Sequence, residues 1–176
     1  MKYFKKLIGE HVYLSPVNVE DAETYVKWLN DPNITQYLDN HHNLIALTGE
    51  KEFLEKESTN EFMFAIVSGE KDELLGNIGL SHIDYKNGAA NLGIFLGEEK
   101  NLGKGYGSEA IKLLLGFCFN ELRLHNVMLT VYEFNERAIK AYTKCGFKEF
   151  GRRHAARFHD GAYHDIIYME VINDKI

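Results

Sequence analysis

The stretch that decides the fold is residues 103–110, which read Gly-Lys-Gly-Tyr-Gly-Ser-Glu-Ala. Three glycines stand at alternate positions after an apolar run and its short loop, where a helical pattern begins. The first N–H groups of a helix have no partner inside the helix and carry the positive end of its dipole, so they can hold a phosphate if no bulky side chain covers them. Glycine leaves that space. The stretch favours a phosphate-binding loop, with a flexible glycine turn that holds no ligand as the plainer alternative.

Spacing disfavours two other nucleotide-binding motifs at this loop. A P-loop has four residues between its first glycine and its Gly-Lys pair, which is followed by Ser or Thr. Here Gly97 and Gly103 enclose five residues, and Lys104 is followed by Gly105. A dinucleotide fingerprint would need its third glycine at Ser108 and a preceding strand from a parallel unit. ATP and NAD are therefore disfavoured as ligands.

The chain before the loop is dominated by strand patterns. Two helices are predicted there: an amphipathic one over 19–29, ended by Asp31-Pro32, and a short one that Thr48 caps and that runs to Lys56. The predicted strands are 12–14, 62–67, 74–83 and 89–96, the last two joined as a hairpin by Asn87-Gly88.

The chain after the loop alternates between helix and strand. The predicted elements are a helix from Gly105 to Leu124, a strand at 127–132, a helix over 135–145 stopped by Gly146, and a hairpin of 147–158 with 163–171 around Asp160-Gly161. This order implies a mixed α/β (α+β) fold, with mostly antiparallel strands and at least one crossover.

A second constellation lies on the helix predicted over 135–145. Asn135 and Tyr142 are seven residues apart, close to two helical turns, so the two side chains face the same way. Both could point into a groove beside the glycine loop. The plainer alternative is that Asn135 only caps the helix and Tyr142 only packs.

Together the two segments resemble the GCN5-related N-acetyltransferase (GNAT) superfamily. Residues 103–110 look like its acetyl-CoA pyrophosphate loop, and residues 135–147 look like its following motif. Residues 28–32 (Trp-Leu-Asn-Asp-Pro) and 163–169 (Tyr-His-Asp-Ile-Ile-Tyr-Met) resemble the branch of ribosomal-protein alanine N-acetyltransferases and spermidine acetyltransferases. The resemblance covers nearly the whole chain. It implies a single N-acetyltransferase domain over 1–176, with about four helices and a twisted sheet of about seven strands splayed between its fourth and fifth strands.

The resemblance also implies the site residues. The pantetheine arm of acetyl-CoA would lie along the fourth strand, 89–96, and Tyr142 would assist the departing sulfur while Asn135 contacts the cofactor. The expected catalytic residues are thus Tyr142 and Asn135. The expected cofactor-binding residues are Ile94, Phe95, Leu96, Gly103, Lys104, Gly105, Tyr106, Gly107, Ser108, Asn135 and Lys144. Loops 31–47 and 157–163 are expected to form the substrate walls.

Two positions depart from the family's pattern. Leu102 stands where many members have Arg or Gln, which removes one side-chain contact to phosphate. Asn91 stands where members of this branch often carry a glutamate that acts as a base, and an amide cannot accept that proton. His82 and Asp84, at the end of the third strand, or a water chain, are the alternative bases.

The predicted reaction is direct attack of a neutral primary amine on the thioester of acetyl-CoA. The acceptor is either a peptide or protein N-terminal α-amine, which is preferred because it loses its proton more easily, or a small-molecule polyamine. Without the glutamate, a catalytically silent acetyl-CoA-binding protein is the alternative. An interaction module with no ligand is a third.

Composition and residue spacing argue against nucleic-acid, metal and membrane partners. The chain has 176 residues with 20 Lys and Arg against 26 Asp and Glu, a net charge of -6, so no nucleic-acid partner is expected. The histidines lack ligand spacing, so no metal is expected, and Cys118 and Cys145 are expected to be buried and free. No apolar run of membrane-spanning length occurs, so a cytoplasmic location without a membrane partner is predicted. A homodimer is expected from the resemblance alone.

Overall fold

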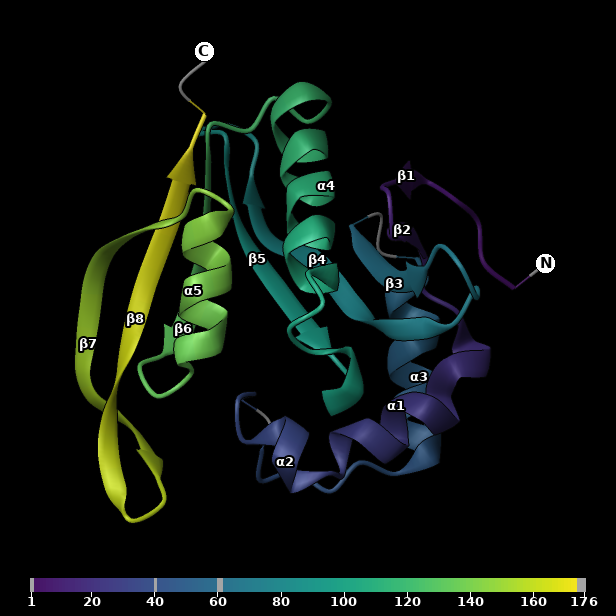
Figure 1. The fold of residues 1–176 in the computed structure, drawn as a ribbon, viewed down its shortest axis with the longest axis horizontal. Coiled ribbons are helices and arrows are strands. Elements are labelled where there is room, and N and C mark those ends of the chain that lie inside the picture. Colours follow the sequence, from purple (N-terminus) through teal and green to yellow (C-terminus); the bar gives the residue numbers. More distant parts are fainter. Residues whose placement is uncertain (1, 40, 60–61, 174–176) are drawn as a thin grey trace. The chain divides into compact units, whose positions relative to one another are not determined.

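Helices and strands, most of the strands antiparallel to their neighbours, build the molecule (Figure 1). The computed structural model describes residues 2–39, 41–59 and 62–173. In that part of the chain the strands are β1 (Leu7–Ile8), β2 (Val12–Pro16), β3 (Met63–Ser68), β4 (Leu74–Asp84), β5 (Ala89–Leu96), β6 (Asn126–Tyr132), β7 (Lys148–His159) and β8 (Ala162–Ile172). The helices are α1 (Ala22–Leu29), α2 (Pro32–Thr35), α3 (Leu47–Glu57), α4 (Tyr106–Asn120) and α5 (Glu136–Lys144), with 3-10 turns η1 (Val19–Asp21) and η2 (Glu99–Asn101).

Hydrogen bonding links the strands in the order β1-β2-β3-β4-β5-β6-β8-β7. The mixed, mostly antiparallel fold is thereby confirmed. The one parallel pair in the described part of the chain, β5 with β6, encloses α4 and is the predicted crossover. It joins Ala89–Asn91 to Asn126–Met128, and no described residue of β5 beyond Asn91 pairs with β6. These two strands are the fourth and fifth of the prediction, so the ladder stops where the splay was expected.

Two elements were not predicted. β1 has only two residues, too few for an apolar pattern, and makes eight strands of the expected seven. α2 follows Asp31-Pro32, where only the end of α1 was expected. The Asp31 side chain accepts a hydrogen bond from the N–H of Asn33 at 2.9 Å, and proline is well suited to the first helical position. The pair therefore ends one helix and begins the next.

The chain divides into two compact units, one up to Gly79 together with Ile94–Leu113, the other Leu80–Gly93 together with the chain from Leu114. A single domain over 1–176 stays a prediction. In the first unit α1 and α3 lie side by side (Figure 1). Their shared core contains Ala22, Tyr25, Trp28 and Leu54, all at most 3% exposed.

The start of α3 differs from the prediction that Thr48 caps it. The helix begins at Leu47 after Ala46, with no side-chain cap. Asn30 accepts a hydrogen bond from the N–H of Ile45 at 3.0 Å and donates one to the Ile45 carbonyl at 2.8 Å. These bonds fix the chain just before Leu47, so a distant asparagine sets the start that local sequence assigned to Thr48.

The second unit carries α5 and the long β7–β8 hairpin (Figure 1). The predicted end of the helix at Gly146 and the predicted hairpin turn at Asp160-Gly161 are both confirmed. Gly146, just past α5, has φ +96°, and the turn residues Asp160 and Gly161 have φ +47° and +80°, as a type I′ hairpin turn requires. Cys118 is buried as expected, whereas Cys145 at the end of α5 is only half-buried. In the described part of the chain, no helix combines the length and apolar character that crossing a bilayer demands.

Candidate active site

The glycine loop opens directly onto the start of α4. Gly103 and Gly105 have φ +74° and +89°, are exposed, and have nothing within 4 Å of the place where a Cβ atom would stand. The N–H of Glu109 bonds to the carbonyl of Gly105 at 2.9 Å, which starts the helical ladder. The N–H groups of Tyr106 and Gly107 come earlier in this first turn, at the positive end of the helix dipole. The loop thus combines an accessible helix start with backbone conformations that favour glycine.

The end of β5 lies against this loop. A methyl group on Gly107 would stand 3.5 Å from Leu96 Cδ1 and 3.8 Å from Ile94 Cδ1. The structure therefore brings the side chains of Ile94 and Leu96 beside Gly107. The Phe95 ring behaves differently. It packs against α1, with its centroid 5.9 Å from that of Trp28 and 6.2 Å from that of Tyr25. The side chain predicted to line the pantetheine thus belongs to the core, because alternate residues of a strand face opposite ways.

A carboxylate that the sequence analysis missed anchors the first turn of α4. Glu109 Oε1 accepts a hydrogen bond from the N–H of His11 at 2.9 Å and another from that of Val12 at 3.4 Å. A Cβ atom on Gly9 would collide with this oxygen. An acidic residue in the first turn of a helix is a recognisable signal, but its partners lie almost a hundred residues away.

The lysines of the predicted site are solvent-exposed. Lys104 lies in the glycine loop of the first unit, and Lys144 lies in the last turn of α5 in the second. Tyr106 and Ser108 are half-buried in the first turn of α4. Each unit therefore gathers its own share of the predicted residues.

On α5, Asn135 caps the helix. Its side-chain oxygen accepts a hydrogen bond from the N–H of Ala138 at 3.2 Å, so Asn135 has the capping role that was the plainer alternative in the sequence analysis. The amide nitrogen of the same side chain remains a donor.

Tyr142 is half-buried two turns further along α5, with its ring centroid 6.0 Å from that of Phe147. Burial first, and Cys145 second, raise the pKa of Tyr142 to about 12. No described residue forms a hydrogen bond with its hydroxyl group. The phenol is therefore a neutral donor that holds its proton firmly.

The alternative bases are poorly suited to the task. Asp84 accepts hydrogen bonds from the N–H groups of Lys86 and Asn87, both at 3.0 Å, and from the Asn87 side chain at 2.7 Å. These bonds hold the pKa of Asp84 below its ordinary value and make it a turn-forming carboxylate. His82 is exposed, has φ +50°, and contacts Ser81 through Nδ1 at 3.2 Å. Asn91 is half-buried and pairs with Met128 of β6.

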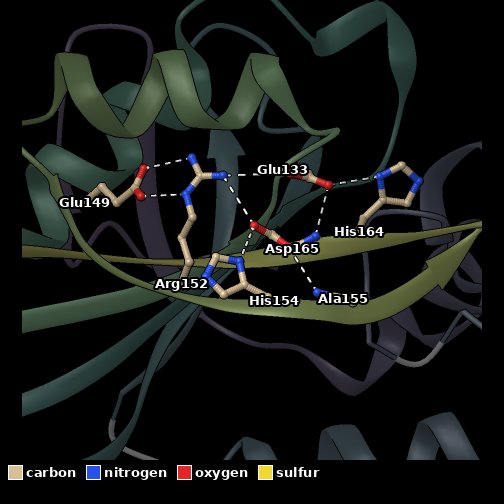
Figure 2. A network of polar contacts seen from close by, with 7 residues as sticks. All are labelled: Glu133, Glu149, Arg152, His154, Ala155, His164 and Asp165. Atoms are coloured by element: carbon tan, nitrogen blue, oxygen red, sulfur yellow. Dashed lines mark hydrogen bonds and ion pairs between the residues drawn. The ribbon is translucent and has the colours of Figure 1, made fainter.

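A polar network on the second unit was not foreseen (Figure 2). Glu133, just after β6, accepts hydrogen bonds from the N–H of Asp165 at 3.0 Å and from His164 Nδ1 at 3.2 Å. Arg152 of β7 forms a paired hydrogen bond with Glu149 and lies 3.6 Å from Asp165. His154 Nδ1 contacts the same aspartate at 2.9 Å. The Glu149–Arg152 pair lies within β7, three residues apart, but the other pairs have no signal in the sequence, because they arise from the registers that join β6 to β8 and β8 to β7.

Comparisons with known proteins agree with this geometry. The family model described as an acetyltransferase (GNAT) domain matches residues 11–148. The chain is 29% identical over 153 residues to an uncharacterised N-acetyltransferase, p20, of Bacillus licheniformis, covering 82% of this chain and 83% of the relative. It is 31% identical over 147 residues to an uncharacterised prophage-derived N-acetyltransferase, YokL, of Bacillus subtilis, covering 82% and 80%.

A solved structure shows the same fold. The spermidine N-acetyltransferase of Vibrio cholerae in complex with CoA and spermine superimposes with a TM-score of 0.83 at 24% identity, covering 95% of this chain and 98% of that one. Three findings support the same family: the family model spans most of the chain, one relative is more than 30% identical, and the glycine loop has the expected form. The chain belongs to the GNAT family and is an acetyl-CoA-dependent N-acetyltransferase.

Proposed function

We propose that this GNAT enzyme transfers the acetyl group of acetyl-CoA to the nitrogen of a primary amine by direct attack, without a covalent enzyme intermediate. The observation that carries the proposal is the glycine loop: Gly103 and Gly105 keep positive φ and leave open space before α4. That form suits a pyrophosphate held by backbone N–H groups.

Other predicted residues of both units would bind the rest of acetyl-CoA. The backbone from Gly103 to Ser108, including Lys104 and Tyr106, would hold the pyrophosphate, and Ile94 and Leu96 would line the pantetheine. Asn135 would contact the cofactor through its free amide nitrogen, and Lys144 would add positive charge at the exposed end of α5. Bound acetyl-CoA supplies an acetyl thioester, the acyl donor of the reaction.

Tyr142 acts on the sulfur as a hydrogen-bond donor. With its pKa at about 12, complete proton transfer to a thiolate of ordinary pKa near ~8.5 would be uphill by about 3.5 units, or about 5 kcal/mol. Donation of a hydrogen bond avoids that cost and still stabilises the charge that develops as the carbon–sulfur bond breaks.

The acceptor class is a primary amine, either a peptide or protein N-terminal α-amine or a polyamine. At pH 7 an α-amine with pKa near ~7.8 costs about 1.1 kcal/mol to deprotonate, and an alkyl amine near ~10.4 costs about 4.6 kcal/mol. The α-amine is favoured by this difference. The polyamine is favoured by a spermidine N(1)-acetyltransferase of Vibrio cholerae, which is 33% identical over 86 residues, 49% of each chain. A homodimer, which the family resemblance implies, and a cytoplasmic location, which the sequence predicts because it holds no apolar run of membrane-spanning length, are also part of the proposal.

The test is release of CoA from acetyl-CoA with spermidine, spermine and short peptides that begin with Ala or Ser. Turnover with one class of amine, with kcat lowered about tenfold or more in Tyr142→Phe at unchanged acetyl-CoA affinity, is the expected result. If acetyl-CoA binds and none of these amines is acetylated, the alternative of a silent acetyl-CoA-binding protein, which Asn91 suggests, replaces the proposal.

A further inference from the structure

The proposed reaction needs a group that removes a proton from the acceptor amine, and the positions considered from sequence do not provide one. Asn91 is an amide, Asp84 is committed to its turn, and His82 is an exposed strand-end residue. In the second unit, the network around Glu133 contains a histidine, His164, whose ring is held by a carboxylate (Figure 2).

One ring nitrogen of His164 forms a hydrogen bond with a carboxylate, and the other is available to accept a proton. Its Nδ1 lies 3.2 Å from Glu133 Oε1, and because an ionised carboxylate only accepts hydrogen bonds, Nδ1 carries the hydrogen of this contact. In the neutral ring Nε2 is then the acceptor. No described residue forms a hydrogen bond with Nε2. A carboxylate that fixes the tautomer in this way is how protein sites prepare a histidine to take a proton.

The carboxylate is itself held in place. Glu133 Oε1 also accepts the N–H of Asp165 at 3.0 Å, and Arg152 Nη1 lies 3.7 Å from Glu133 Oε2. Glu133 stands two residues before Asn135, the residue that the family resemblance assigns to the cofactor. The held carboxylate and the predicted cofactor residue thus share the short connection between β6 and α5.

Rings cover the histidine without closing it off. The centroid of Phe134 lies 5.0 Å from that of His164, edge to face, and Phe134 stacks on His159 at 4.4 Å. The side chain of His164 is 25% exposed, so a substrate nitrogen can reach it. The charged groups nearby are Glu133, Asp165 and Arg152 of the network, Arg157, which pairs with His164 across the β7–β8 ladder, and His159 and Asp160 at the hairpin turn.

His154 provides an internal comparison. It also contacts a carboxylate through Nδ1, Asp165 at 2.9 Å, but its side chain is 79% exposed on β7. The two histidines therefore share a chemical pairing and differ in burial and in the rings around them.

We infer that His164 is the proton acceptor for the amine and that Glu133 is its positioning residue, an inference that rests on the proposed function. His164 Nε2 takes one proton from the acceptor ammonium group, which leaves a neutral amine and an imidazolium. The nitrogen lone pair forms the N–C bond, and the C–S bond breaks as the tetrahedral intermediate collapses. The second proton on nitrogen goes to the departing sulfur, and the imidazolium returns its proton to solvent. The products are the acetylated amine, CoA and one proton.

The experiment compares His164→Gln, Glu133→Gln and the matched control His154→Gln in the CoA-release assay, with acetyl-CoA binding measured for each variant. At pH 7, His164→Gln is expected to lower kcat/KM about 100-fold, the lower range for a general base, and Glu133→Gln about tenfold. His154→Gln keeps wild-type activity. All three variants keep acetyl-CoA affinity, which shows that they are folded.

The pH profile separates proton acceptance from support of the fold. With a peptide α-amine, whose pKa is near ~7.8, the deficit of His164→Gln should shrink at least tenfold between pH 6.5 and pH 9, because the substrate then arrives neutral. Equal activity of His164→Gln and His154→Gln, or a deficit that does not change with pH, would overturn this inference alone. A wild-type enzyme that acetylates no amine would overturn the proposed function together with it.

Discussion

The helices α4 and α5 begin in opposite ways. α4 starts from exposed glycines with positive φ and open space around them, whereas α5 starts from Asn135, whose own side chain occupies the N–H of Ala138. A helix start can hold an anion only if its N–H groups are not already satisfied. The comparison supports the proposal that α4 binds the phosphates and that the region around α5 contributes side-chain chemistry.

Substitution of Gly105 by valine would break the α4 side of this comparison. A β-branched residue at φ +89° is strained, so the loop should leave the form that presents its N–H groups. Loss of two charge-assisted hydrogen bonds, each contributing about 1.5–3 kcal/mol, should weaken acetyl-CoA binding by about 100-fold or more. Calorimetric titration with acetyl-CoA measures this.

A glycine in another setting is the control for that experiment. Gly49, in the first turn of α3, has open space around a Cβ atom and no positive φ, so Gly49→Ala should bind acetyl-CoA normally. Wild-type affinity of Gly105→Val would show that backbone conformation at the loop does not decide binding.

A third helix start, that of α3, sharpens the comparison because it has no side-chain cap and buries a carboxyl group. Glu50 is 4% exposed, one of its carboxylate oxygens has no hydrogen-bond partner among the described residues, and burial raises its pKa to about 7. Because the folded-state pKa lies above the unfolded value of about 4.5, ionisation of Glu50 opposes folding. The free energy of unfolding is therefore not lowered by this group below pH 4.5, and it falls as pH rises through 7. Glu50→Gln should therefore raise the free energy of unfolding at pH 8 by up to about 3 kcal/mol.

Urea unfolding of wild type and Glu50→Gln at pH 4.5 and pH 8 is the measurement. The two proteins should have similar stability at the lower pH and diverge at the higher one. A stability difference that is the same at both pH values would contradict the assignment of the buried charge to Glu50.

The smallest expected effect concerns the start of α5. Asn135→Ala removes the cap and should lower the free energy of unfolding by about 1 kcal/mol, whereas Asn135→Asp keeps an accepting oxygen and should retain most of that stability. If Asn135 also donates to the cofactor through its amide nitrogen, both variants lose acetyl-CoA affinity, because neither keeps the donor. Unchanged affinity in both would leave capping as the only role of this residue.

Local signals in the sequence were sufficient where a residue's task depends on its immediate neighbours. The positive φ of Gly146 and the turn at Asp160-Gly161 follow from glycine's freedom and from turn chemistry, and the structure confirms the elements built on them. The cap at Asn135 is equally local. For the same reason the order of the elements, and with it the fold class, could be predicted.

Only the tertiary structure decided which distant residues meet. The ring of Phe95 packs against the core because Tyr25 and Trp28 of α1 lie on its side of β5. The contacts of Glu109 with His11 and of Glu133 with His164 join residues 98 and 31 positions apart. Strand register and helix placement create such pairs, and neither is written in the spacing of the residues concerned. The sequence by itself determined the family and the proposed loop for the cofactor. The packing of the strands determined the candidate for the proton acceptor, because a carboxylate and an imidazole become a pair only once the sheet has formed.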